Sequence, residues 1–158
     1  MSTTTNKKPK KKNSKSGNSH EIKNNLFDNF IKFSNREKNS SSIRPKYGDI
    51  YTCDLGINVG SELDDVRPCI IITSDKYNEK STVITVIPIS KKNKLFFHQV
   101  EINSLTVEEI ESNIEGIAKL EQIRTISKGR LGRKIGKMSS EGMDRINRAI
   151  EFHFCLNR

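Results

Sequence analysis

The sequence predicts a mainly β domain with a C-terminal helix, preceded by a disordered basic tail and a short helix. Short stretches rich in β-branched and aromatic residues recur from residue 48 onward, and a helical spacing of apolar residues ends the chain. The charge is unevenly spread: residues 1–46 hold 12 Lys and Arg against 3 Asp and Glu, and the remaining residues hold 16 of each. The whole net charge of +9 therefore belongs to the first 46 residues.

The first 45 residues divide into two segments. Residues 1–20 have no apolar residue after Met1, so we expect a disordered tail, because ordering it would cost conformational entropy that nothing offsets. Residues 21–45 comprise a predicted amphipathic helix over 21–36 and a linker. The apolar residues of that helix recur at three- and four-residue steps, namely Ile22, Leu26, Phe27, Phe30, Ile31 and Phe33.

From residue 46 to residue 158 the pattern is that of a separate folded domain. Five short strands are predicted, at 48–54, 68–74, 82–89, 96–102 and 116–120. Such strands with one closing helix favour a small, partly open barrel.

Two helical segments are predicted within this domain. Thr106 and Glu109 have the spacing of a capping box, which predicts one or two helical turns over 106–112. The final helix should begin at Ser139 or Ser140 and run to about Phe154. One face of that helix would carry Met143, Ile146, Ile150 and Phe154.

The sequence lacks the motifs that several classes of protein need. The three cysteines are odd in number and have no CxxC spacing, so neither a disulfide framework nor a zinc site is indicated. No run of about 18 apolar residues and no signal-peptide pattern occurs, so we expect a cytoplasmic protein without a membrane partner. His98 in a strand and His153 at a helix end are isolated, and no metal or other cofactor is predicted.

Two motifs carry a family resemblance. The segment KYGDIYTCDLGINVGSELDDVRPCIII, residues 46–72, joins a GDIY strand to a Gly-Ser-Glu loop and Val-Arg-Pro. The segment KLEQIRTISKGRL follows at residues 119–131. Together they resemble the MazF/PemK/Kid family of toxin ribonucleases, in the family's order over residues 46–157.

The resemblance implies an SH3-like (CcdB/PemK-like) barrel, a homodimer and metal-independent, sequence-specific cleavage of single-stranded RNA. It also implies products with a 2′,3′-cyclic phosphate and a 5′-hydroxyl, and a cognate antitoxin whose flexible segment fills the RNA groove. The predicted helix over 21–36 could either pack on the barrel or cover the RNA groove.

The resemblance places the family's catalytic arginine on Arg67 and its catalytic hydroxyl on Ser90, the last residue of a Pro-Ile-Ser triplet. A guanidinium suits phosphate chemistry, because its planar fork of donors matches the phosphate oxygens and keeps its charge. Glu121 is the candidate general base, although it could equally form an ion pair with Arg124. Without the resemblance, Arg67 would be a solvated residue at a strand start and Ser90 a turn residue.

RNA contacts are expected from the Gly-Ser-Glu loop and from two basic stretches. The candidates are Ser61, Glu62, Lys91, Lys92, Lys94, Lys119, Gln122 and Arg124. Residues 119–137 hold seven basic residues against one acid, which can follow a phosphate backbone or form a solvated loop. Gln122 and Arg124 could instead tie a loop down, and Phe96 or Phe97 could stack on a base or join the core.

The sequence departs from the family pattern in three places. Asp64 and Asp65 stand where small residues such as glycine are usual, Ser90 replaces threonine, and the first 45 residues have no counterpart. Two alternatives to an endoribonuclease remain: a non-enzymatic CcdB-like toxin that inhibits DNA gyrase, and a catalytically silent nucleic-acid-binding module.

Overall fold

The computed structural model describes residues 43–91, 99–110 and 114–156. The predicted tail and the predicted helix over 21–36 lie outside these residues, as do Lys92, Lys94, Phe96, Phe97 and His98. The strands are β1 (Asp49–Asp54), β2 (Val66–Ile71), β3 (Val83–Ser90), β4 (Val100–Ile102), β5 (Val107–Ile110), β6 (Gly116–Ala118), β7 (Arg124–Ser127) and β8 (Leu131–Met138). Two α-helices, α2 (Asp75–Lys80) and α3 (Ser140–His153), and two 3₁₀ turns, η1 (Leu120–Gln122) and η2 (Lys128–Arg130), complete this part.

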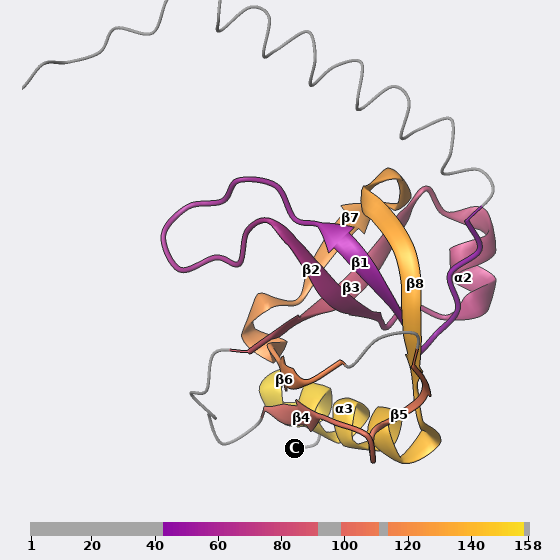
Figure 1. Ribbon diagram of the computed structural model, residues 1–158, viewed down its shortest axis with the longest axis vertical. Coiled ribbons are helices and arrows are strands. Elements are labelled where there is room, and N and C mark those ends of the chain that lie inside the picture. The colour runs from indigo at the N-terminus through magenta and orange to yellow at the C-terminus, as the bar shows by residue number, and fades with distance from the viewer. Residues whose placement is uncertain (1–42, 92–98, 111–113, 157–158) are drawn as a thin grey trace, which may run out of the picture. The chain divides into compact units, whose positions relative to one another are not determined.

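The strands form one antiparallel sheet in the order β4-β6-β3-β2-β1-β8-β5, with β7 also paired to β3 (Figure 1). The centre of this arrangement is β3, because β2 lies along one of its edges while β7 and then β6 lie along the other. The sheet bends into a nearly closed barrel, and α3 lies against its lower end in Figure 1. The predicted mainly β fold with a C-terminal helix is therefore confirmed.

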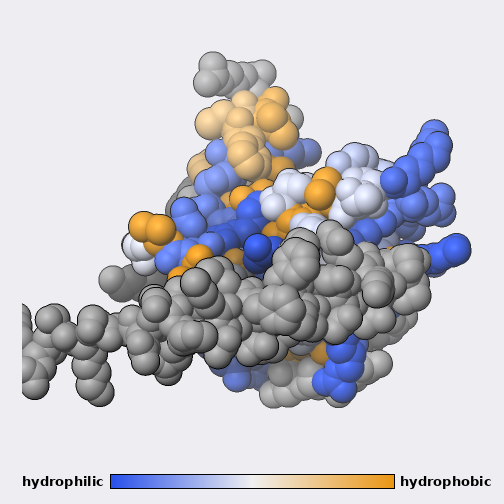
Figure 2. Space-filling view, turned by 90° about the horizontal axis from the view of Figure 1, so that it is seen from above, coloured by the Kyte–Doolittle hydropathy of each residue, from blue (hydrophilic) through white to orange (hydrophobic). Residues whose placement is uncertain are grey.

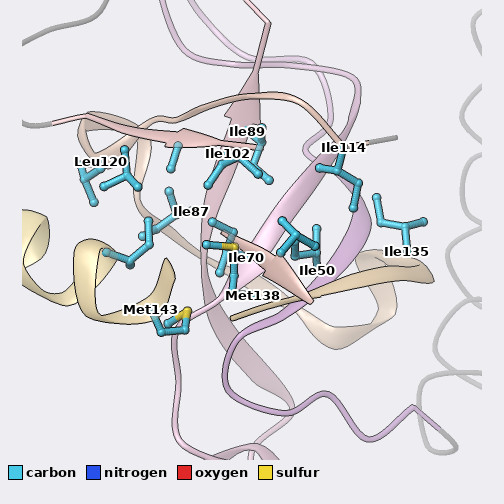
Figure 3. Packing of buried hydrophobic residues seen from close by; sticks show 14 residues of the cluster. Ile50, Ile70, Ile87, Ile89, Ile102, Ile114, Leu120, Ile135, Met138 and Met143 are labelled. Carbon is cyan, nitrogen blue, oxygen red and sulfur yellow. The ribbon is translucent and has the colours of Figure 1, made fainter. Parts of the chain in front are cut away.

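Alternating side chains divide the barrel strands between two buried clusters. Ile50, Ile70 and Ile87, from three neighbouring strands, point into the first cluster in Figure 3. Cys69 and Ile71, on either side of Ile70 in β2, belong to the second. Successive side chains of a strand point to opposite faces, so both faces of β2 are buried.

The first cluster is covered by α3, whose start is defined by a side-chain cap. The Ser139 hydroxyl accepts a hydrogen bond from the Gly142 amide at 3.0 Å, as the predicted helix start requires. Met143 and Ile146 are buried beneath the helix, so two of the four predicted positions lie in the core. The helix ends at His153, and Phe154, its C-cap, remains 52% exposed.

The helix predicted over 106–112 is wrong in its described part, because Val107–Ile110 form β5 and pair with β8. The Thr106 hydroxyl accepts from the Asn103 amide at 2.9 Å, so it closes a turn before a strand instead of capping a helix. The apparent capping box arose because a threonine that closes a turn and one that caps a helix use the same hydroxyl acceptor.

The helix α2, the strands β7 and β8 and the two 3₁₀ turns were not predicted. The strand β8 contains Gly132 and Gly136 among basic residues, and its pairing with β1 shifts register twice. A bulge adds a residue to one strand, so side chains beyond it no longer alternate between faces. The alternation of apolar and polar residues by which a strand is identified is therefore absent from the sequence of β8.

Candidate active site

Arg67 is the second residue of β2 and pairs with Cys53 of β1. Its Nε donates to the Asp64 carbonyl oxygen at 2.7 Å, and its Nη2 lies 3.4 Å from Asp64 Oδ1. The side chain is 26% exposed, so the guanidinium is held by the protein and still reaches solvent. An oriented guanidinium of this kind can receive a phosphate without first losing much side-chain freedom.

Ser90 is the last residue of β3, the strand that pairs with β2. The ladder between β2 and β3 closes at the pair Cys69 and Pro88, after which β3 pairs with β6 through Ser90 and Ile117. Arg67 and Ser90 each lie two residues beyond that last β2–β3 pair, at the same end of this ladder. The two predicted catalytic residues thus stand at a fork where neighbouring strands separate, with Ser90 only 3% exposed.

Glu121, in η1, belongs to a chain of three polar side chains. Gln99 Nε2 donates to Glu121 Oε1 at 2.9 Å, and Lys119 Nζ donates to Gln99 Oε1 at 3.3 Å. Lys119 is 7% exposed, so this amide links a buried ammonium to a carboxylate. The expected ion-pair partner, Arg124, instead donates to Gln122 Oε1 at 2.8 Å.

Gln99 was missed by the sequence analysis. A glutamine just before a strand has no pattern that marks it, and its two partners lie 20 and 22 residues further along the chain. Only the pairing of β4 with β6 brings this part of the chain beside residues 119–121.

Gln122 fastens the loop between β1 and β2. Its Oε1 accepts from the Leu63 amide at 3.1 Å and from Arg124, and its Nε2 donates to the Ser61 carbonyl at 3.2 Å. This supports the expectation that Gln122 ties a loop down. A hollow of about 340 Å³ lies beside it, lined by Glu62, Glu121, Gln122, Ile123 and Arg124.

Replacing Gln122 with leucine should loosen this loop. The Leu63 amide and the Arg124 guanidinium would lose their acceptor, which should lower the free energy of unfolding by roughly 1–3 kcal/mol. Faster cleavage by an added protease between residues 56 and 64, together with a lower melting temperature, would report the change. Gln122→Glu keeps the acceptor oxygen and should have a smaller effect, so equal effects of both variants would contradict this assignment.

Three more basic residues of the stretch 119–137 make contacts within the protein. Lys128 donates to the Asn78 carbonyl, Arg130 Nη1 donates to the Asp54 carbonyl at 3.1 Å, and Lys134 lies 2.9 Å from Asp49 Oδ1. These contacts serve the fold, so three of the seven basic residues in the stretch 119–137 are engaged within the protein. Lys91, which directly follows Ser90, is exposed and remains available to RNA.

Two buried cysteines lie on the Arg67 face of the sheet, but they are not suited to nucleophilic chemistry. A hydrogen bond with Cys69 and burial raise the pKa of the Cys53 thiol well above its ordinary value. A protonated thiol is a poor nucleophile. Among the described residues, no three His, Cys, Asp or Glu side chains are grouped so as to hold a metal ion, and no helix has the length and apolar character to cross a membrane.

Known proteins resemble this chain in sequence and in fold. Residues 46–154 match the family described as "PemK-like, MazF-like toxin of type II toxin-antitoxin system". The chain is 38% identical over 114 residues to the endoribonuclease EndoA of Bacillus subtilis, covering 70% of this chain and 95% of that relative. It is also 34% identical over 113 residues to the endoribonuclease MazF of Staphylococcus saprophyticus, covering 70% of this chain and 91% of that relative.

The fold is shared with the crystal structure of MazF from Deinococcus radiodurans, with a TM-score of 0.62 at 12% identity, covering 72% of this chain and 98% of that one. The family match spans the strands β2 and β3, which carry Arg67 and Ser90, and the turn η1, which carries Glu121. The chain belongs to the PemK-like and MazF-like toxins of type II toxin–antitoxin systems.

Proposed function

We propose that this chain cleaves single-stranded RNA at short sequences by promoting attack of the RNA's own 2′-hydroxyl, at the fork that carries Arg67 and Ser90. Its family and its relatives make it an endoribonuclease toxin. The observation that supports the site most directly is the Arg67 guanidinium, held at 2.7 Å by a backbone carbonyl and still in reach of solvent.

The proposed reaction needs three tasks from the protein. A base takes the 2′-hydroxyl proton while the 2′-oxygen bonds to phosphorus, the bond from phosphorus to the 5′-oxygen breaks, and negative charge grows on the phosphorus oxygens. Arg67 stabilises that charge, and the Ser90 hydroxyl donates to a phosphate oxygen. The products are a 2′,3′-cyclic phosphate and, once the departing oxygen takes up a proton, a 5′-hydroxyl.

Glu121 takes the role of base in this proposal. Gln99 binds its Oε1, which leaves the other carboxylate oxygen for the 2′-hydroxyl proton. Ser61, Glu62, Lys91, Gln122 and Arg124 would line the path of the RNA around this centre.

We further propose that the chain forms a homodimer and binds a cognate antitoxin. We also propose that it acts on RNA in the cytoplasm. One relative in fold, a mycobacterial endoribonuclease with a TM-score of 0.55, was solved in complex with its cognate antitoxin. Apolar residues reach the surface between polar ones in Figure 2, and Val66 and Leu105 are 64% and 74% exposed. Such residues are available to a protein partner.

The domain division follows from the same proposal. Residues 46–158 form the toxin domain, and the basic residues 1–20 would add non-specific affinity for RNA through phosphate contacts. Residues 21–45 would form a helix and linker between the two.

Incubating a long single-stranded RNA with the protein, with and without EDTA, tests the proposal. We expect the same fragments in both cases, with new 5′-hydroxyl ends at one short recurring sequence. RNA that stays intact would point to a gyrase-inhibiting toxin or a silent binding module. Cleavage that EDTA abolishes would exclude the metal-independent mechanism.

A further inference from the structure

Asp64 is a carboxylate at the centre of the site that the proposed reaction does not use. We propose that the Asp64 carboxylate, which lies against Arg67 in the RNA-free protein, competes with an RNA phosphate for the charge of this guanidinium and so weakens RNA binding. This inference rests on the proposed function, since it concerns the same arginine. It makes Asp64 the residue that sets the affinity and the salt dependence of RNA binding at this site.

The two contacts of Asp64 with Arg67 have different origins. The short one, 2.7 Å, runs from Nε to the backbone carbonyl and would persist with any side chain at position 64. The long one, 3.4 Å, runs from Nη2 to the carboxylate. The direction of the guanidinium therefore depends on the backbone contact. The carboxylate chiefly offsets the positive charge of the guanidinium.

The donor geometry of arginine makes the carboxylate a competitor for phosphate. A guanidinium offers five N–H groups, and it binds a phosphate best through two parallel donors. Because the backbone carbonyl holds Nε, a phosphate bound in this way must use Nη1 and Nη2. Nη2 carries two N–H groups and lies 3.4 Å from the Asp64 carboxylate, so a phosphate on Nη1 and Nη2 would lie close to that negative charge.

The carboxylate can be displaced but cannot move far away. Its side chain is 50% exposed, and ion pairs of such exposure are weak. The backbone on either side of it is anchored: the Leu63 amide donates to Gln122, and Asp65 exchanges backbone hydrogen bonds with Leu55 and Gly56. A displaced carboxylate would thus stay near the bound phosphate and repel it.

Asp64→Asn and Asp65→Asn form a matched pair that tests this inference. Both remove one negative charge from adjacent residues, and Asp65 makes no contact with Arg67 in the part of the chain that the structure describes. Asparagine at 64 keeps an oxygen that can accept from Nη2. The probe is a single-stranded RNA containing a site mapped with the wild-type protein, with a 2′-deoxy residue at that site for binding and the natural ribose for cleavage.

We expect Asp64→Asn to bind the probe about fivefold more tightly or better, since a like charge within a few ångströms of the phosphate is removed. The value of kcat/KM should rise by a similar factor, and the slope of log affinity against log salt should steepen by about 0.7, as for one more phosphate contact. Asp65→Asn should change affinity by less than about twofold, because its charge lies outside the contact.

Equal effects of the two substitutions, or a lower kcat/KM for Asp64→Asn with an unchanged melting temperature, would overturn the inference. Its failure is distinguishable from failure of the proposed function. If the wild type cuts RNA and the two variants behave alike, only the role of Asp64 is refuted. If the wild type cuts no RNA, the proposed function falls, and binding of an all-deoxy single strand decides whether Asp64 competes for Arg67.

Discussion

Replacing Arg67 with alanine is expected to lower the rate of RNA cleavage by on the order of a hundredfold or more, as loss of one preorganised donor does in other enzymes. The guanidinium is held at the fork before RNA arrives, so it can stabilise charge that develops only in the transition state. Affinity for RNA should fall much less, because Lys91 and the rest of the RNA path remain. Single-turnover cleavage and binding to a 2′-deoxy analogue separate the two quantities.

Arg67→Lys is the matched control. Lysine keeps the positive charge but lacks the two-pronged geometry, and it cannot place one donor on the Asp64 carbonyl and two others on phosphate as arginine does. We expect it to restore only part of the rate. An Arg67→Ala protein that cut RNA at the wild-type rate would refute the proposed mechanism.

Replacing Gly116 with alanine should destabilise the fold next to Ser90. Its φ of 153° suits glycine, and a Cβ there would lie 2.9 Å from the Ser90 carbonyl oxygen and 2.9 Å from Ile89 Cγ2. Backbone strain and overpacking together should lower the free energy of unfolding by roughly 2–5 kcal/mol. Because the clash falls on Ser90 itself, the remaining folded protein should also cut RNA more slowly.

Gly60→Ala separates strain from crowding. Gly60 also has a positive φ, 65°, but a Cβ there would meet nothing within 4 Å. It should cost only the left-handed conformation, roughly 1–2 kcal/mol. Urea unfolding of both variants measures the difference, and equal losses would show that the contact with Ser90 has no effect on stability.

How much of the fold could be predicted depended on whether a pattern stayed within one element. The strands β1 and β3 and the helix α3 have regular apolar spacing, and a serine cap marks where α3 begins. The strand β8 was missed because two register shifts in its pairing with β1 break the alternation. The strand β5 was mistaken for a helix, since its preceding threonine makes a local hydrogen bond that both structures use.

The site divides in the same way. Arg67, Ser90 and Glu121 lie within motifs that the sequence displays, and whether they act as the resemblance implies stays a prediction. The contacts among the site residues depend on strand register, which no motif specifies. Asp64 was noticed as a departure from the family pattern, yet its pairing with Arg67 through both backbone and side chain is visible only in three dimensions. Gln99 had no signal at all.

The position of β3 in the sheet has a consequence for the cell that makes this protein. The strands β6 and β7, which pair with β3, are synthesised after it. The strand β1 pairs with β8, which is synthesised later still and ends at Met138. A chain still growing on the ribosome therefore carries Arg67 and Ser90 without the fork that aligns them. We therefore expect a nascent chain that ends before β8 to cut no RNA, which cleavage assays on chains truncated before and after Met138 can measure.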